Sequence, residues 1–464
     1  MTHNYDVIIV GGGPAGIFAA LELSQAENLS VLLIEKGKDI SQRRCPVRDT
    51  GKPCVTCSPC NVVCGLGGAG AFSDGKLVLS SQVGGQLEDY IGKDNVDSLI
   101  DYVDSLYLKF GATEKVFGRG AEVAKISRRA EQAGMRLIPT PVRHMGTENC
   151  YAVMKAMQDY LLPRLEFKLD LMVARVLVDN GVVEGIETDD GERFFCRYLV
   201  LAPGREGSDW LSREAERLNL TMYNNPIDVG VRVEVPFTVM KELTDVLYEV
   251  KLEYMSRSFN DRVRTFCMCP AGEVIMESTG GSDPVITVNG HSYAEEKSDT
   301  TNFALLVSTN FTSPFNEPIA YGKYLARLAN LLGGGVLVQR LGDLLKGRRS
   351  TPERIEEGKV EPTLKSAAPG DISFALPYRH LTDLVEMLQA MDKMTPGIAA
   401  PDTLLYGIEV KFYSCRPELS PCLETEISNM FAVGDGTGIS RGLVQASASG
   451  LIAAVEIMRR MRKG

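Results

Sequence analysis

A glycine-rich turn close to the N-terminus constrains the fold of this chain more than any other feature. A short β-branched run, residues 6–10, leads without a gap into a turn at residues 11–16 and then into an apolar helical stretch. Gly11 permits the tight turn, Gly13 lets the backbone approach a pyrophosphate, and Gly16 lets the helix pack close to the strand. The helix N-terminus then favours the phosphates through its unpaired N–H groups and its dipole.

A second strand strengthens the prediction of a dinucleotide site. Residues 30–34 are apolar and end at Glu35, whose carboxylate can accept both ribose hydroxyls of an adenosine half. Glu35 followed by Lys36 suits either NAD or FAD. The residues predicted to bind the cofactor in this part of the chain are Gly11, Gly13, Pro14, Ala15, Gly16, Glu35 and Lys36.

Two distant segments favour FAD over NAD. Residues 165–207 have the pattern of a β-rich insert with two hairpin turns, followed by a strand that ends at Ala202-Pro203-Gly204. This end resembles that of two-dinucleotide-fold flavoproteins, with proline where threonine is usual. Residues 428–436 form another strand pattern ending at Gly434-Asp435, and a helix of small residues follows from Gly442.

The resemblance to flavoproteins implies a role for each of these segments. In proteins with the second signature, the aspartate accepts a ribitol hydroxyl, and the helix N-terminus faces the N1/C2=O edge of the flavin. A helix N-terminus there stabilises the negative charge of reduced flavin. The further residues expected to contact FAD are Val173, Ala202, Gly204, Gly434, Asp435, Gly442 and Leu443.

Four more segments resemble a family of bacterial FAD-dependent dehydrogenases of unassigned substrate. They are residues 67–77, 228–234, 263–270 and 288–293, so the likeness covers nearly the whole chain. The resemblance implies a flavin fold but supplies no reaction. By analogy, the loop at residues 67–77 is expected to run along the flavin with Ser73 or Lys76 near its edge, although it can also be a connection without a chemical role.

Five of the eleven cysteines are clustered near the N-terminus: Cys45, Cys54, Cys57, Cys60 and Cys64. The spacing of the last four is that of the bacterial ferredoxin run, which predicts an iron–sulfur cluster such as [4Fe–4S]. Four thiolates can also hold structural zinc, and free or redox-active thiols are the third alternative. A cluster would pass single electrons to the flavin and so replace a nicotinamide domain, because no second strand–glycine turn–helix unit occurs in the sequence.

Three residues are candidates for the reaction itself. His144 can act as an acid near neutral pH, and Arg264, together with Arg143, can bind a substrate carboxylate. Cys267 is spaced from Cys269 so that both thiols should lie on one face of a strand, where either can donate a proton. Ordinary structural roles are the alternative for each of these side chains.

Charge and hydropathy exclude several classes of partner. The net charge of −10 argues against nucleic acid, because binding phosphate chains requires a dense basic surface. No apolar run reaches the length of a membrane span or a secretory signal, so we expect a cytoplasmic protein without a membrane partner.

The expected fold class is α/β: a split Rossmann-type FAD-binding domain with a β-rich insert and an α+β substrate lobe. The FAD-binding domain is expected to comprise residues 1–84, 165–225 and 404–464, with a helical covering segment at 85–164 and the substrate lobe at 226–403. The expected function is that of an FAD-dependent dehydrogenase or reductase acting on a small or medium organic molecule. Its electrons would come from a ferredoxin-type or NAD(P)H donor. A flavin monooxygenase and a flavin/thiol redox sensor without turnover are the alternatives.

Overall fold

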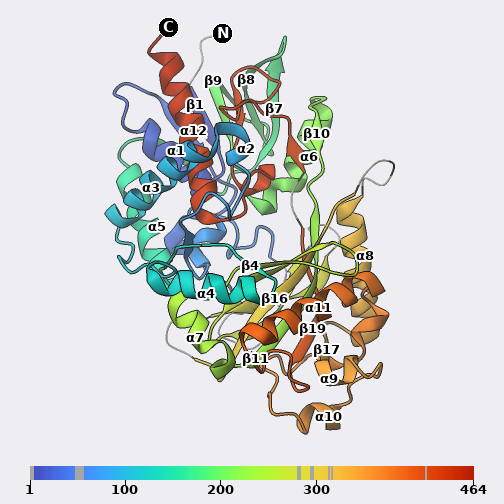
Figure 1. The fold of residues 1–464 in the computed structure, drawn as a ribbon. Helices are drawn as coiled ribbons and strands as arrows, with labels where there is room; N and C mark the ends of the chain where they lie inside the picture. Colours follow the sequence, from blue (N-terminus) through green and yellow to red (C-terminus); the bar gives the residue numbers. More distant parts are fainter. Residues whose placement is uncertain are drawn as a thin grey trace. The chain divides into compact units, whose positions relative to one another are not determined.

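The computed structural model describes residues 5–46, 57–279, 284–292, 297–311, 314, 317–412 and 415–463, and Figure 1 shows its fold. The chain divides into two compact units. The first unit comprises Met1–Lys115, Arg143–Asn224 and Ser414–Gly464, and the second comprises Val116–Val142 and Asn225–Tyr413.

The first unit contains a parallel sheet of five strands. Their order is β6 (Glu166–Lys168), β2 (Val31–Ile34), β1 (Tyr5–Val10), β9 (Arg193–Leu201) and β21 (Met430–Ala432). The first half of β9 also pairs antiparallel with β8 (Val182–Thr188), which pairs in turn with β7 (Val173–Asp179). Side chains of β1 and β2 are buried along continuous apolar runs, which is typical of a parallel sheet covered on both faces.

Two helices of the first unit pack closely on each other: α1 (Pro14–Leu23) and α12 (Leu443–Met461). They cross where a Cβ atom on Gly450 would lie 2.0 Å from the carbonyl oxygen of Ala15, so only glycine fits at that position. The other α-helices of this unit are α2 (Glu88–Ile91), α3 (Lys93–Lys109), α5 (Thr147–Leu161) and α6 (Ser208–Arg217). Its short strands are β3 (Lys76–Val78), which pairs with β5 (Val142–His144), and β10 (Met222–Tyr223), which pairs with β20 (Arg416–Pro417).

The second unit is built on a sheet of eight strands. Their order is β18 (Ala368–Pro369), β17 (Leu337–Arg340), β19 (Leu404–Lys411), β11 (Ile227–Pro236), β16 (Thr300–Thr309), β13 (Arg262–Cys269), β12 (Leu252–Met255) and β4 (Arg136–Leu137). A hairpin of β14 (Glu273–Thr279) and β15 (Val285–His291) accompanies it. The α-helices are α4 (Ala121–Gln132), α7 (Phe237–Leu247), α8 (Pro318–Gly333), α9 (Leu341–Leu344), α10 (Pro352–Glu356) and α11 (Tyr378–Met394).

The structure has the expected α/β class, with a parallel dinucleotide-type sheet, a β-rich insert and a separate α+β unit. Two of the expected domain boundaries differ from those of the structure. Residues 404–411 form β19, which pairs with β11 and β17, so the chain returns to the first unit only after this strand. Residues 116–142 belong to the second unit because β4 pairs with β12 at the edge of its sheet. Among the helices of the described ranges, none combines the length and apolar character required to cross a membrane.

Candidate functional site

The glycine turn between β1 and α1 has the geometry that its sequence predicts. Gly11 has a φ of +107°, and a Cβ atom there would lie 2.0 Å from the carbonyl oxygen of Ala202. A Cβ atom on Gly16 would lie 1.9 Å from the carbonyl oxygen of Gly11. Gly13 differs, because the nearest atom to its Cβ position is 3.9 Å away, at Gly68. A Cβ atom at Gly13 would thus meet only an ordinary van der Waals contact, and the helix begins without a side-chain cap, as an anion-binding N-terminus requires.

Glu35, at the end of β2, is buried and already holds three backbone N–H groups. Its Oε2 accepts a hydrogen bond from Gly12 N at 2.7 Å. Its Oε1 accepts from Gly37 N and from Gly65 N, both at 2.9 Å. A carboxylate has about four acceptor positions. One position is thus left for a ribose hydroxyl, where the sequence suggested two. The neighbouring Lys36 is half-buried.

The ends of β9 and β21 meet the glycine turn, so the three segments predicted to bind FAD lie together. The N–H of Gly434 donates to Ser449 Oγ on α12 at 2.9 Å, and a Cβ atom on Gly434 would lie 2.9 Å from Cβ of Ala15. A Cβ atom on Gly436 would lie 2.2 Å from the carbonyl oxygen of Gly204. These close approaches fix the turn after β21 against both α1 and the end of β9.

Asp435 lies in this turn and is partly exposed. Its Oδ1 accepts a hydrogen bond from Ser440 Oγ at 2.6 Å, and its Oδ2 lies 3.7 Å from Nε of the exposed Arg205. Helix α12 begins after Gly442, which provides no side-chain cap, and Leu443 is its first residue. A carboxylate and an uncapped helix N-terminus therefore stand close together in sequence at the end of the sheet.

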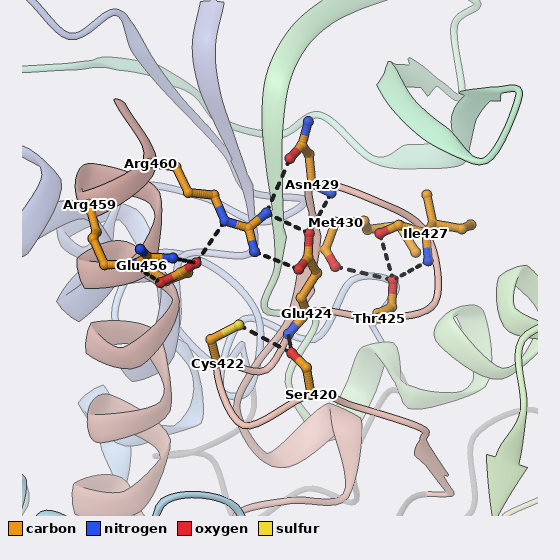
Figure 2. Close-up of polar contacts among 10 residues, drawn as sticks. All are labelled: Ser420, Cys422, Glu424, Thr425, Ile427, Asn429, Met430, Glu456, Arg459 and Arg460. Carbon is orange, nitrogen blue, oxygen red and sulfur yellow. Dashed lines mark hydrogen bonds and ion pairs between the residues drawn. The ribbon is translucent and has the colours of Figure 1, made fainter. Parts of the chain in front are cut away.

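An ion-pair network fixes the segment that leads into β21 (Figure 2). Arg460 on α12 donates to both carboxylate oxygens of Glu424, at 2.7 and 2.6 Å, and to Asn429 Oδ1 at 3.3 Å. It also donates to Glu456 at 2.7 Å. Hydrogen bonds from Arg459 and Arg460 lower the pKa of Glu456 to about 2. The C-terminal turns of α12 are thereby tied to the loop that positions Gly434.

The glycine-rich loop after the cysteines lies against the same turns. Gly67 N donates to Gly12 O at 2.8 Å, and a Cβ atom on Gly70 would lie 2.8 Å from Cδ2 of Leu443. Ser73 Oγ donates to Gly70 O at 2.9 Å, and Lys76 Nζ lies 3.0 Å from Asp74, so both candidate side chains have partners within the loop.

Val173, the first residue of β7, is buried in a core cluster that also holds side chains of β1 and β2. The backbone just before it follows the end of β2, because Leu171 N donates to Glu35 O at 3.2 Å. Val173 is therefore close to the carboxyl end of β2.

The candidate reaction residues lie in different units. His144 ends β5 in the first unit and is half-buried. The adjacent Arg143 is buried and donates to both oxygens of Asp104, at 2.8 and 2.7 Å, so its charge is balanced within the fold. Arg264, in β13 of the second unit, pairs through its Nη2 with one carboxylate oxygen of the buried Asp228. The positive charge of each arginine is therefore already paired with an aspartate and is not left uncompensated for a substrate carboxylate.

The regular alternation assumed for Cys267 and Cys269 does not hold. The register of β13 shifts between Phe266 and Cys269, and Cys267 has a φ of +44°. The carbonyl oxygen of Cys267 accepts from Arg232 Nη2 at 2.6 Å, and Arg232 Nη2 lies 3.4 Å from Cys269 Sγ. A β-bulge thus positions these cysteines, and the backbone of Cys267 is held in a conformation that is rare outside glycine.

The cysteine cluster is not supported as a metal site. Cys45, Cys57 and Cys60 are partly exposed, whereas Cys64 is buried, and its burial raises the thiol pKa to about 11. Within the part of the chain that the structure describes, no group of three histidine, cysteine or acidic side chains is arranged to hold a metal ion. Cys54 lies outside the described residues. These thiols therefore give no structural support to iron–sulfur or zinc.

The second unit has a cleft of about 440 Å³ with a charged rim. Two threonines in its wall donate to the buried Glu234 behind it: Thr300 Oγ1 at 2.8 Å and Thr363 Oγ1 at 2.6 Å. Tyr406 Oη donates to the other oxygen of Glu234 at 2.5 Å. The remaining lining residues are Pro236, Glu273, Asp299, Lys359, Val360, Glu361, Pro362 and Lys365.

Sequence reasoning missed two side chains that organise the flavin segments. Arg43 was not singled out, although it is 3% exposed and contacts the cysteine-rich loop. Ser449 was not singled out, although it accepts the N–H of Gly434. No local pattern marks either residue, because both are defined by partners far away in sequence.

Comparison with known families agrees with this geometry. Residues 226–412 match the family model "FAD-dependent protein, C-terminal domain-like". Residues 5–52 match "Pyridine nucleotide-disulphide oxidoreductase", and residues 364–464 match "Glucose inhibited division protein A". A curated relative, an uncharacterized protein of Clostridium beijerinckii, is 28% identical over 479 residues, covering 98% of this chain and 80% of that protein.

Two solved structures align with nearly the full length of this chain, but with low TM-scores. Formate oxidase of Aspergillus oryzae RIB40 has a TM-score of 0.45 and 11% identity, covering 100% of this chain and 99% of the other. L-proline dehydrogenase of P. horikoshii has a TM-score of 0.42 and 12% identity, with coverages of 99% and 95%. These scores carry no weight for function. The family matches and the glycine turn agree that the chain is an FAD-dependent oxidoreductase, and its sequence is similar to two-dinucleotide-binding flavoproteins.

Proposed function

We propose that this protein is a dehydrogenase or reductase that transfers a hydride between FAD and a small or medium organic molecule. The observation that carries the proposal is the convergence of the turn after β1, the end of β9 and the Gly434–Asp435 turn in one unit. When bound, FAD supplies hydride transfer at its N5 atom, and the protein supplies binding, orientation and exclusion of water.

The residues of the first unit fit the parts of FAD in a definite order. The N-terminus of α1 beside Gly13 would hold the pyrophosphate, and the free acceptor position of Glu35 would take a ribose hydroxyl of the adenosine half. Asp435 would accept a ribitol hydroxyl. The N-terminus of α12 after Gly442 would stabilise negative charge on the ring.

The reaction needs a proton and a source or acceptor of electrons. We propose His144 and Cys267 as candidate proton donors, and Arg264 as a residue that orients the substrate despite its pairing with Asp228. A ferredoxin-type protein or NAD(P)H is proposed as the electron partner. Exchanging each candidate in turn would separate these roles, since a proton donor changes the pH profile of turnover and a binding residue changes mainly KM.

A titration of the apoprotein with FAD, followed by anaerobic reduction, tests the proposal. We expect the purified protein to bind FAD, and the flavin to be reduced by NADH, NADPH or reduced ferredoxin. Asp435→Asn should weaken FAD binding by about tenfold, the effect expected for losing one hydrogen bond to a charged group. Protein that takes up no FAD, or an Asp435→Asn variant that binds FAD like the parent, would contradict the assignment of the site.

A further inference from the structure

The cysteine-rich segment is bound to the nucleotide end of the predicted FAD site by a chain of backbone hydrogen bonds. Cys64 N donates to Cys60 O at 2.8 Å, and Gly65 N donates to Glu35 Oε1 at 2.9 Å. The next two residues continue the series: Leu66 N donates to Lys38 O at 3.0 Å, and Gly67 N donates to Gly12 O at 2.8 Å. The loop is thus part of the wall around the glycine turn and Glu35.

One buried cation sets the shape of this loop. Arg43 donates to the carbonyl oxygens of Asn61 at 2.9 Å, Val62 at 2.7 Å and Leu66 at 2.6 Å. Its guanidinium also lies 4.7 Å from the centroid of the Phe72 ring. Burial lowers the pKa of Arg43 to about 10. Because one guanidinium binds the carbonyl groups of residues 61–62 and also that of Leu66, a displacement of residues 61–62 would also displace Leu66.

The loop has little room to move without disturbing Glu35. A Cβ atom on Gly37 would lie 2.5 Å from Gly65 N, and a Cβ atom on Gly12 would lie 2.7 Å from Cδ2 of Leu66. Gly37 and Gly12 also donate to the two oxygens of Glu35. A displacement of residues 64–66 would therefore strain or break the hydrogen bonds that orient this carboxylate.

Two partly exposed thiols directly precede residues 61–67 of this loop in the sequence. Cys57 and Cys60 are both free and partly exposed, and Ser58 and Pro59 separate them. This is the Cys-x-x-Cys spacing of redox-active dithiols. Cys60 immediately precedes Asn61 and Val62, whose carbonyl groups Arg43 holds.

We propose that Cys57 and Cys60 form a redox dithiol whose oxidation to a disulfide loosens the FAD site through Arg43 and Gly65. The oxidant is a small-molecule disulfide. One protein thiolate attacks it and releases one thiolate of the oxidant, and the second protein thiolate then attacks the mixed disulfide and releases the other. Two protein thiols thus lose two electrons and two protons, and the small disulfide is reduced to two thiols.

The position of the dithiol separates this role from electron transfer to the ring. Gly65 contacts Glu35, and in a dinucleotide fold the carboxylate at the end of the second strand binds the ribose of the adenosine half. The flavin ring is at the opposite end of the cofactor. The dithiol therefore acts on retention of FAD and not as an electron relay, in contrast to the relay suggested by the cysteine spacing.

The test compares FAD affinity in the reduced and oxidised states of the full chain, and it rests on the proposed FAD binding. Apoprotein is kept in dithiothreitol or treated with oxidised glutathione, the disulfide is located by peptide mass mapping, and FAD is titrated by fluorescence. We expect oxidation to weaken FAD binding by about tenfold, as for the loss of one charge-assisted hydrogen bond. Reduction should restore the affinity.

Two variants complete the design. Cys60→Ser should bind FAD like the reduced parent and should not respond to oxidised glutathione. Cys422→Ser, which changes a partly exposed cysteine elsewhere in the first unit, should respond like the parent. Equal affinity in both states with a mapped Cys57–Cys60 disulfide would overturn the inference, as would failure of that disulfide to form or metal bound to these thiols after purification. Absence of FAD binding in the reduced state would instead refute the proposed function.

Discussion

Replacing Asp383 by asparagine should stabilise the protein at alkaline pH but not at acid pH. Asp383 lies on α11, is 0% exposed, and has no well-formed hydrogen bond to either carboxylate oxygen within the described residues. Burial, with a smaller contribution from the neighbouring Asp261 carboxylate, raises the pKa of Asp383 to about 6. Arg379 compensates Asp261, not Asp383, since it donates to both oxygens of Asp261.

The sign follows from proton binding. An aspartate in the unfolded chain has a pKa of about 3.9, so between about pH 4 and pH 6 the folded protein binds more protons at this site than the unfolded chain does. Stability therefore falls as pH rises through this interval. For a single group shifted by about two units, the loss between pH 5 and pH 8 is about 1.5 kcal/mol, and asparagine removes it.

Thermal unfolding at the two pH values measures this difference. For a domain of this size, about 1.5 kcal/mol corresponds to roughly 3–6 °C, so the Tm of Asp383→Asn relative to the parent should rise by that amount from pH 5 to pH 8. Asp245→Asn, at an exposed carboxylate on α7, should give no such trend. A Tm difference that is the same at both pH values would refute the reasoning, because a packing effect of the substitution does not titrate.

Three other substitutions test contacts in the two units. Glu409→Gln removes the shared partner of two cationic side chains, one of them fully buried, and should lower the free energy of unfolding by about 3–5 kcal/mol in a urea titration. Gly436→Ala places a Cβ atom 2.2 Å from the carbonyl oxygen of Gly204 and should reduce the FAD content of the purified protein. Ser449→Ala leaves the buried N–H of Gly434 without its acceptor and should lower stability by about 1–3 kcal/mol in the same titration.

Each of these substitutions has a matched control. Glu361→Gln, at an exposed i,i+4 pair, should leave the urea midpoint unchanged. Gly335→Ala should leave the FAD content unchanged, because the nearest atom to its Cβ position is 3.6 Å away. Ser98→Ala, on the exposed face of α3, should not change stability measurably. A control that behaves like its test variant would show that the named contact is not the cause.

The sequence was sufficient to predict the flavin segments, because each depends on local backbone requirements. Gly11 and Gly16 are needed for close approaches within one turn, and Glu35 follows a buried strand directly. The hairpin turns at 179–181 and 189–191 were likewise predicted from their Asn-Gly and Asp-Gly signals, and β7, β8 and β9 occur where expected.

The parts that were not predicted depend on partners distant in sequence. Arg143 and Arg264 look like anion-binding residues until their partners, Asp104 and Asp228, are known. The bulge at Cys267 arises from pairing between β13 and β16, which no local signal reveals. Similarly, residues 404–411 resemble any buried strand, and only their pairing with β11 assigns them to the second unit.

Strand β11 shows why a buried strand can be recognised from its sequence while its role cannot. Its apolar side chains, Val229, Val231, Val233 and Val235, alternate with the charged residues Asp228, Arg232 and Glu234, and all of them are buried. Burying three charges on one strand face is unfavourable unless each has polar partners. Asp228 pairs with Arg264 and accepts from Ser308, and Arg232 pairs with Glu409 and donates to Asn302. Glu234 accepts hydrogen bonds from the hydroxyl groups of Thr300, Thr363 and Tyr406. A register slip of one residue would move all three charges among the valines and leave every partner unpaired. The charged row therefore fixes the pairing of β11 with β16 and β19, and it leads at Glu234 to the threonine wall of the cleft in the second unit.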